Sequence, residues 1–582
     1  MQTQQLHERG QRVDTDVVPG RKQKPSRTLR KRFSRRPSVW FLVALGLLLL
    51  LSSTIVFPQL RLVQEAFTTD DGAFSLGNFI QFFLTPRFQE AIVNSLLIAL
   101  IAGLLACAVA VPAAYILAQY DLPNRNGFLT LATMATVSPP FLGAYAWVLL
   151  LGRGGILTVQ LREWGITLPF ETIIGPGGIV WVTVWATQAL VFLLAYDAFR
   201  AIDPTLDEAA ASVGAEPWRT RIGIVLPMAI PALVTGFYMS SMKIFTDFGT
   251  PLIIGGGTPT LPTAVYYEFL SEVSTNPAIA SAASLVMLGI ACIALALQQW
   301  VLRRRTYASV SVRRRPLQPV SGAKRALMLA YLGVVFGLSF VPHAVVVGTS
   351  FLTWRSGILK WVPTLDNYQR LFGEHLGTIL ISLVLAAIAC VFCVIVAVLV
   401  SYLTVRKRYA VISPALNVIT MIPYIIPGTV LAIGLILSFS SGPLILTGTA
   451  TILVLAYFVR RLPYITKSIE AALTQVHPAL EEAAMSVGAK PMRAFRQITL
   501  PLIRPAVVSG GTVGFLQMVT ELSATIMLYS VPFITMTVVI FTNAMQPASP
   551  MGVASATTVV LMLSVYIPLY FVRKKFASVT SI

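Results

Sequence analysis

The chain has 582 residues, of which 55% are hydrophobic and only 12% are charged. The mean hydropathy is +0.75, and this composition excludes an ordinary soluble domain, in which about a quarter of the residues are charged. The formal net charge of +20 could indicate a nucleic-acid partner, so its distribution along the chain decides what it means.

Apolar runs of about 20 residues, the length at which a helix crosses a bilayer, occur in two sets of six. The predicted spans are 39–57, 91–118, 128–151, 178–196, 222–245 and 279–301, then 326–350, 376–404, 411–438, 447–465, 497–519 and 552–572. Pro139-Pro140 and the stretch from Pro423 to Pro427 make the third and ninth spans the least regular. The sequence therefore predicts an all-α membrane protein with about twelve transmembrane helices.

Two basic segments of low hydrophobicity separate the apolar regions. Residues 1–38 form an Arg- and Lys-rich tail, which we expect to lie disordered on the anionic inner leaflet. Residues 303–325 contain two Arg-Arg-Arg runs and are predicted to be a cytoplasmic linker. We therefore predict a first half at 39–302, a second half at 326–575 and a short cytoplasmic tail at 576–582.

The positive charge is unevenly distributed between the two sides of the predicted membrane. Most of the 44 Lys and Arg residues fall in segments that are cytoplasmic if the N-terminus lies inside. This count places Arg460 and Arg461 with the cytoplasmic charge. The pattern follows the positive-inside rule, so it predicts contact with membrane lipid, cytoplasmic termini and no nucleic-acid partner.

One segment occurs in both halves. Pro204 to Ala232 and Pro478 to Ala506 align without a gap, and 16 of their 29 positions are identical. Both copies share Glu-Ala-Ala, then Gly four positions later, then Ile-x-Leu-Pro. The residues of the first part of this pattern are Glu208, Ala209, Ala210 and Gly214, and in the second copy Glu482, Ala483, Ala484 and Gly488.

Each copy is predicted to form two short helices joined by a tight turn. Pro204 and Pro478 suit the first position of a helix, where a missing N–H costs nothing. The alanines then favour a helix, which ends where Gly214 or Gly488 accommodates a positive φ. A single copy is compatible with a mere amphipathic connector, but two matched copies argue against that interpretation.

This repeated pattern resembles the EAA signature of permease subunits of binding-protein-dependent ABC importers. The resemblance implies the type I permease fold, with two homologous six-helix halves in a bacterial inner membrane. It also implies that the EAA loops at 203–227 and 477–501 contact a cytoplasmic dimer of ABC ATPases, which binds ATP. A periplasmic or lipid-anchored solute-binding protein would deliver the cargo from the other side.

Motifs for catalysis or nucleotide binding are absent from the sequence. No Gly-Lys dipeptide occurs, so the chain has no phosphate-binding P-loop, and we expect it to bind no cofactor and to be no enzyme. Cys390 and Cys393 lie one helical turn apart, but small packing residues are the favoured interpretation because no His or carboxylate accompanies them. We therefore predict no metal site and a separate ATPase polypeptide.

Two carboxylates stand at equivalent places after the fifth span of each half. Asp247 and Glu521 are separated by the same 274 positions as Gly214 and Gly488. Charged side chains at membrane depth usually face a cavity or a partner, so these carboxylates are candidates to line the pathway and attract a cation. They are equally compatible with anchoring helix ends, and Lys243, one helical turn before Asp247, favours that alternative somewhat.

The sequence around these carboxylates is similar to that of ferric-iron permeases. The similarity rests on DFGTPLIIGG from Asp247 and ELSATIMLYSVPFITMTVVIFTNA from Glu521, in a fused layout with twelve predicted spans. Ser523 departs from the family pattern, in which proline is common. Ferric iron is the cargo that the resemblance implies, and 2-aminoethylphosphonate, thiamine or a polyamine remain alternatives within the same importer class.

Two functions of other classes compete with this interpretation. A secondary transporter also contains internal repeats, but it needs functional charges in its spans and no ATP. A membrane scaffold or sensor would transport nothing. Because the most similar segments of the two halves are loops predicted to be cytoplasmic, the ABC importer permease is preferred over both.

Overall fold

The computed structural model describes residues 39–69, 71–166, 172–270, 276–303, 316–355, 358–545 and 551–575. The predicted tails at 1–38 and 576–582, and residues 304–315 of the predicted linker, lie outside these described residues. The described chain consists almost entirely of helices, with two small two-stranded sheets.

The first half begins with α1 (Val39–Leu51), which continues through the π-helical turn η1 (Ser52–Val56) into α2 (Phe57–Ala66). The following helices are α3 (Gly77–Leu84), α4 (Pro86–Gln119), α5 (Arg125–Val137), α6 (Pro140–Leu151), α7 (Ile156–Glu163), α8 (Pro176–Ala201), α9 (Thr205–Ser212), α10 (Pro217–Thr220), η2 (Arg221–Val225), α11 (Leu226–Phe245), α12 (Gly249–Ile254), α13 (Leu261–Leu270) and α14 (Pro277–Arg303). Many of these helices begin at a proline, whose fixed φ and missing N–H suit the first helical turn.

The second half repeats this order. Its helices are α15 (Gly322–Ser350), α16 (Asp366–Glu374), α17 (Leu376–Tyr402), η3 (Leu403–Lys407), α18 (Ile412–Ile425), α19 (Gly428–Phe439), α20 (Ala450–Gln475), α21 (Ala479–Ser486), α22 (Pro491–Ala494), η4 (Phe495–Thr499), α23 (Leu500–Val519), α24 (Thr525–Leu528), η5 (Val531–Phe533), α25 (Met536–Met545) and α26 (Met551–Lys575). The π-helical turns η2 and η4 precede equivalent helices, so the internal repeat extends to this local detail.

The strands are short and peripheral. β1 (Tyr120–Asp121) pairs in parallel with β2 (Gln318–Pro319). β3 (Leu352–Arg355) and β4 (Ile358–Pro363) form an antiparallel hairpin with an irregular register between Leu352 and Thr353.

Ten helices of the described chain are long and apolar enough to cross a membrane, and eleven if one bent pair counts as a span. The sequence predicts twelve, and the difference is α20, the tenth predicted span. This helix is 26 residues long, but Arg460, Arg461, Lys467 and Glu470 lower its apolar character. The length of α20 therefore fits the predicted tenth span, but its charged residues make it less apolar than the other spans.

The two spans that the prolines mark as irregular are indeed broken. The third predicted span divides into α5 and α6 at Ser138 and Pro139. The ninth divides into α18 and α19, which meet at an angle of 115°. Pro139 and Pro427 occupy the N-cap positions of α6 and α19 with extended backbone, which explains why each helix starts in a new direction.

The packing follows the repeat. In the first half α4, α8 and α11 pack against one another, as α17, α20 and α23 do in the second half. The helix that opens each half packs against the opposite half. Helix α1 contacts α17 and α18, and α15 contacts α4, α5 and α6. The two halves are therefore interlocked, and the boundary between them in sequence is no boundary in packing.

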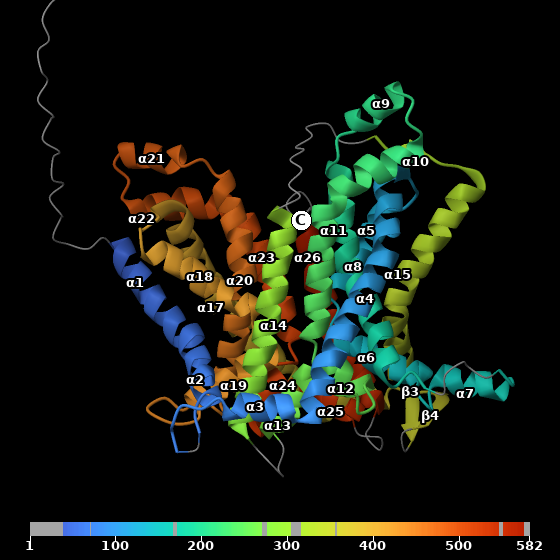
Figure 1. Cartoon of the computed structure of the whole chain (residues 1–582), viewed down its shortest axis with the longest axis horizontal. Coiled ribbons are helices and arrows are strands. Elements are labelled where there is room, and N and C mark those ends of the chain that lie inside the picture. Colours follow the sequence, from blue (N-terminus) through green and yellow to red (C-terminus); the bar gives the residue numbers. More distant parts are fainter. Residues whose placement is uncertain are drawn as a thin grey trace, which may run out of the picture.

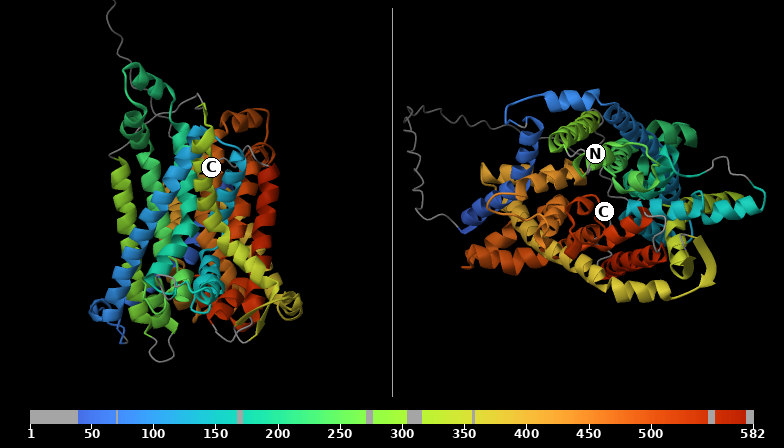
Figure 2. Two further views of the ribbon diagram at one scale, coloured as in Figure 1. Left: turned by 90° about the vertical axis from the view of Figure 1, so that its right-hand side faces the viewer. Right: turned by 90° about the horizontal axis from the view of Figure 1, so that it is seen from below.

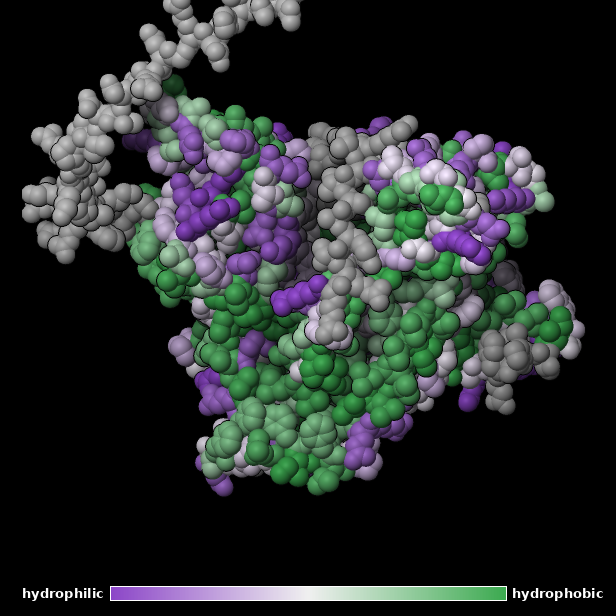
Figure 3. All heavy atoms as spheres, turned by 45° about the horizontal axis from the view of Figure 1, so that its top comes forward, coloured by the Kyte–Doolittle hydropathy of each residue, from purple (hydrophilic) through white to green (hydrophobic). Residues whose placement is uncertain are grey.

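All the long helices run between two ends of the molecule (Figures 1 and 2). Helices α9, α10, α21 and α22 form one end, at which α1 also begins and α26 ends (Figure 1). Short helices, among them α3, α12, α13 and α25, form the other end. Figure 3 shows hydrophobic residues covering the flank below a more polar end, the surface distribution that a lipid bilayer requires.

Candidate functional site

The repeated segment folds into the same helical knuckle in both halves. In the first knuckle α9 ends at Ser212, and Gly214 follows two residues later with a φ of +77°. The Gly214 N–H donates to the Ala211 carbonyl at 3.0 Å, and the Ala215 N–H donates to the Ala210 carbonyl at 3.0 Å. These two bonds define a Schellman motif, in which a left-handed glycine satisfies the last carbonyls of a helix.

The second knuckle repeats this geometry. Gly488 has a φ of +92°, and its N–H donates to the Met485 carbonyl at 3.0 Å, while the Ala489 N–H donates to the Ala484 carbonyl at 3.0 Å. The first helices of the two knuckles begin one residue after Pro204 and Pro478, which are their N-cap residues. Both knuckles therefore have the two-helix structure that the sequence predicts, with a start shifted by one residue.

The residues of the repeated pattern are mostly on the surface of the knuckles. Glu208 and Glu482 are exposed, as are Ala209 and Ala483, whereas Ala210 is buried and Ala484 is half-buried. Large apolar side chains beside them are also exposed, and the most exposed are Val213 at 83% and Val487 at 87%. Exposed apolar side chains that recur at equivalent positions indicate a contact surface for another protein.

The second knuckle is held to the membrane helices by a buried carboxylate that the sequence analysis missed. Glu481 precedes the exposed Glu482 and is only 8% exposed. The Tyr402 hydroxyl donates to Glu481 Oε2 at 3.0 Å, and the Thr499 hydroxyl donates to Glu481 Oε1. In the first half Asp207 and Val225 occupy the corresponding positions, so the threonine hydroxyl has no counterpart there.

We expect Tyr402→Phe to destabilise the protein by about 1–3 kcal/mol, because a buried charged acceptor loses a hydrogen bond. The measurement is thermal unfolding of the purified chain in detergent. Tyr570→Phe is the control, since Tyr570 is 62% exposed, and its unfolding temperature should stay unchanged. Equal stability of the wild type and Tyr402→Phe would show that this hydrogen bond does not anchor the knuckle.

A cavity of about 320 Å³ lies between the two halves. Its walls come from the breaks between α5 and α6 and between α18 and α19, from α20, and from the C-terminal ends of α11 and α23. The fifth predicted span of each half (α11 and α23) and the broken third span of each half thus line the cavity from equivalent places. The residues on these elements include Asp247 and Glu521, which the structure brings to one cavity.

Glu521 is fully engaged by two arginines of α20. Arg460 Nη1 lies 2.7 Å from Glu521 Oε1 and Arg461 Nη2 lies 2.8 Å from Oε2. The Ala524 N–H also donates to Oε1 at 3.1 Å. A Cβ atom on Gly428 would stand 1.7 Å from Arg460 Nη1, so only glycine at this position leaves room for the arginine. These contacts favour the helix-anchoring interpretation of Glu521 over cation attraction.

Asp247 has a different environment. Its Oδ1 accepts the Gly249 N–H at 3.1 Å, so the carboxylate caps the start of α12. Lys243 and Asp247 interact electrostatically, although no ion pair joins them within the described chain. The equivalent of Lys243 in the second half is Gln517, whose backbone carbonyl accepts a hydrogen bond from Arg461 at 3.1 Å.

Arg460 and Arg461 line the cavity, which corrects their assignment to the cytoplasmic charge. They stand near the middle of α20 (Ala450–Gln475), inside the tenth predicted span. The signal that could have located them was already in the sequence. Two adjacent arginines within an apolar run need a buried partner, although this requirement does not specify which carboxylate it is.

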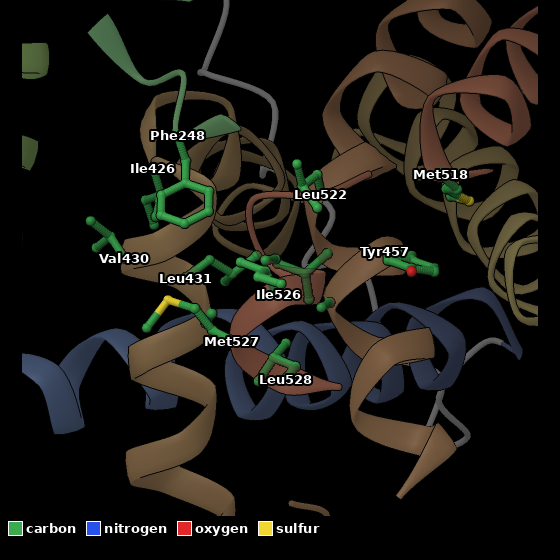
Figure 4. Close-up of a cluster of buried hydrophobic side chains, with 14 of the residues drawn as sticks. Phe248, Ile426, Val430, Leu431, Tyr457, Met518, Leu522, Ile526, Met527 and Leu528 are labelled. Atoms are coloured by element: carbon green, nitrogen blue, oxygen red, sulfur yellow. The ribbon is translucent and has the colours of Figure 1, made fainter. Parts of the chain in front are cut away.

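A cluster of buried apolar side chains adjoins the cavity, and Ile426 and Leu522 belong to both. Figure 4 shows Phe248 beside Ile426, with Leu522, Ile526 and Met527 in the same buried cluster. The halves meet closely here, because a Cβ atom on Gly249 would lie 3.0 Å from Leu522 Cδ2. We call these side chains the apolar seal; they belong to elements at the end of the molecule formed by α12 and α25 (Figure 1).

Within the described residues no group of three or more His, Cys, Asp and Glu side chains is arranged to hold a metal ion. Cys393 is buried, and Cys390 Sγ lies 3.2 Å from the Gly511 carbonyl. His343 Nε2 lies 3.1 Å from the Ser138 hydroxyl and 2.6 Å from the Tyr566 hydroxyl. These side chains therefore contact neighbouring helices of the bundle.

Two interlocked helical repeats with matching knuckles at one end and a polar cavity between them define a membrane transport permease. The chain belongs to the family of binding-protein-dependent transport system inner membrane components, whose model matches residues 110–307 and 394–578. One match falls in each half. The protein is thus a multi-pass inner-membrane protein and an ABC importer permease with both permease units fused in one polypeptide.

Several relatives resemble the chain over most of its length. The ferric transport system permease protein FbpB of Actinobacillus pleuropneumoniae is 25% identical over 83% of this chain and 71% of that protein. The Fe(3+)-transport system permease protein FbpB 2 of Haemophilus influenzae is 25% identical over 93% of this chain and 99% of its own length.

A third relative matches less than half of the chain. PhnV of Salmonella paratyphi A, named as a 2-aminoethylphosphonate transport system permease protein, is 29% identical over 42% of this chain and 94% of that protein. Among solved structures, a bacterial ABC transporter involved in the import of the polysaccharide alginate matches 46% of this chain and 96% of the other chain, with 19% identity and a TM-score of 0.39.

Proposed function

We propose that this chain forms the translocation pathway of an ATP-driven importer for ferric iron. The observation that carries the proposal is the pair of matching knuckles. Two Schellman turns with the same hydrogen bonds, at Gly214 and Gly488, hold exposed acidic and apolar side chains at one end of the molecule. Such a pair fits two copies of one partner, as a dimeric ATPase would provide.

In this proposal the ATPase is a separate polypeptide that binds ATP, since this sequence has no P-loop. Each ATPase subunit receives one knuckle, with Glu208, Ala209, Ala210 and Gly214 in the first contact, and Glu482, Ala483, Ala484 and Gly488 in the second. Exposed apolar side chains such as Val213 and Val487 supply apolar contact area, and closure of the ATPase moves α11 and α23 through the knuckles.

The knuckle end is assigned to the cytoplasm because the positive charge of the chain is concentrated in segments on that side. The start of α1 and the end of α26 lie there too (Figure 1), consistent with cytoplasmic termini. A periplasmic or lipid-anchored solute-binding protein would deliver the cargo to the opposite end. The apolar seal then acts as the outer gate, and the cavity behind it receives the solute when the gate opens.

Ferric iron is preferred as cargo because the two ferric-transport relatives match across both halves. A specific observation also favours 2-aminoethylphosphonate, since PhnV is 29% identical over 42% of this chain. Both solutes would use the same pathway, knuckles and ATPase, so the two candidates differ only in the cargo.

Labelled ferric-iron uptake in cells lacking this chain tests the proposal, with other iron routes disabled. We expect the deletion to abolish uptake and a plasmid copy of the wild type to restore it, because the chain supplies the only pathway of this importer. Labelled 2-aminoethylphosphonate is measured in the same strains. If the deletion strain takes up iron normally but no phosphonate, the cargo is the phosphonate and not iron. If it takes up both solutes normally, neither is the cargo.

A further inference from the structure

The charged residues that line the cavity carry a net positive charge. Three cationic and two anionic side chains face it: Lys243, Arg460, Arg461, Asp247 and Glu521. Full ionisation of this set leaves one positive charge in a low-dielectric site, where unscreened charges act strongly. The cavity is therefore electrostatically suited to an anion, although the sequence alone had pointed to its carboxylates.

Glu521 is not available to hold a cation, and Asp247 is only partly engaged. Both oxygens of Glu521 accept arginine hydrogen bonds at 2.7 and 2.8 Å, and the side chain is only 4% exposed. Asp247 Oδ1 accepts the Gly249 N–H, whereas its buried Oδ2 makes no hydrogen bond in the described chain, and Lys243 acts on this carboxylate electrostatically. A cation entering the cavity would have to displace the arginines from Glu521, or share Asp247 with the ammonium of Lys243.

Lys243 is the cationic group left available. Its ammonium forms no ion pair or side-chain hydrogen bond with any described residue, and the side chain is half-buried in the cavity wall. An ammonium at this depth is costly unless it faces a cavity or a partner. It offers three donors, and charge-assisted hydrogen bonds to an oxyanion are the strongest that it can form.

Other donors surround the same space. Tyr238 and Tyr424 line the cavity, as does Ser138, whose hydroxyl also lies 3.1 Å from His343 Nε2, and Arg461 lies over the Tyr464 ring at 6.0 Å. No cluster of His, Cys, Asp and Glu suited to a bare metal ion occurs among the described residues. The volume of about 320 Å³ lies at the lower limit of ligand pockets, which hold small solutes.

We propose that this cavity is a binding site for a small oxyanion, a solute that carries carboxylate or phosphonate groups, with Lys243 as its principal charged contact. Iron then crosses as an anionic complex with such ligands and not as the bare ferric ion. The part concerning iron rests on the proposed function, whereas the anion site itself does not.

Equilibrium binding to the purified full-length chain in lipid nanodiscs tests this site. The probes are ferric citrate labelled on both iron and citrate, labelled 2-aminoethylphosphonate, and hexaamminecobalt(III) as an inert trivalent cation. We expect saturable binding of at least one of the two anionic probes and no competition by the cation. Joint retention of both labels marks a ferric complex as the ligand, and retention of the phosphonate alone marks the free oxyanion.

The variants separate the charge of Lys243 from its packing. Lys243→Gln should weaken anion binding by about tenfold, the effect of one charge-assisted hydrogen bond, while Lys243→Arg keeps the affinity within a few-fold. Lys360→Gln, at an exposed lysine of β4 outside the cavity, should bind like the wild type. Thermal unfolding of each variant checks that the fold is retained.

Equal anion affinity of Lys243→Gln and the wild type would overturn the site, as would competition by hexaamminecobalt(III) or a lack of binding of both anions. This assay needs no ATPase, so its outcome is separate from uptake in cells. If the deletion strain takes up iron normally while Lys243 governs anion binding, the proposed cargo fails and the anion site stands.

Discussion

Gly488→Arg is expected to abolish solute uptake while the chain remains in the membrane at its normal level. Gly488 has a φ of +92°, a conformation that costs a residue with a Cβ about 1–2 kcal/mol. Nothing lies within 4 Å of a Cβ at this position, so the helical bundle itself is not disturbed. The arginine projects instead from the knuckle that we assign to the ATPase contact, and coupling is lost.

Gly442→Arg is the matched control. Gly442 also has a positive φ, +89°, and nothing within 4 Å of a Cβ. It belongs to the loop between α19 and α20, which lies at the end opposite the knuckles (Figure 1). Both variants introduce a similar backbone strain, but only Gly488 lies in a knuckle. Uptake should therefore persist in Gly442→Arg. Uptake and membrane content are measured together in the deletion strain. Normal uptake by Gly488→Arg, or equal loss in both variants, would argue against a special role of the knuckle.

Glu521→Gln is expected to lower the free energy of unfolding by about 3–5 kcal/mol, the effect of removing one partner from a buried ion pair. The carboxylate neutralises Arg460 and Arg461 at once, so the amide leaves two cations beside each other with no counter-charge. Thermal unfolding of the purified chain in detergent measures the change.

The pair formed by Lys467 and Glu470 provides the control for this variant. Its atoms lie 2.7 Å apart and the lysine is 51% exposed, so Lys467→Gln should cost about 1 kcal/mol or less. Replacing Arg460 and Arg461 by glutamine in the Glu521→Gln background should recover part of the loss, because no unpaired charge then remains. A Glu521→Gln protein as stable as the wild type would mean that the arginines find other partners.

Much of the fold follows from local features of the sequence. Apolar run length predicts the spans, and the prolines predict the breaks that Pro139 and Pro427 introduce before α6 and α19. The knuckles follow from the sequence as well, since Gly214 and Gly488 have the positive φ that ends a helix in a Schellman motif. In each case the cause lies within a few residues of the effect.

The features that the sequence analysis missed depend on contacts between distant segments. The pairing of Arg460 and Arg461 with Glu521 joins α20 to the end of α23, and the Glu481–Tyr402 hydrogen bond joins α21 to α17. The packing of α1 against α17 and α18 of the other half is also a contact between distant segments. No periodicity or motif specifies which charged side chain meets which, so the electrostatic character of the cavity emerged only from the structure.

The central claim is that this chain couples a separate ATPase to import through its knuckles. The most direct measurement is labelled ferric-iron uptake in cells lacking the chain, complemented with the wild type or with Glu482→Lys. Glu482 is exposed, so its replacement should leave the chain in the membrane in equal amount. We expect uptake to be restored by the wild type alone, whereas uptake restored equally by Glu482→Lys would contradict the coupling role of the knuckle.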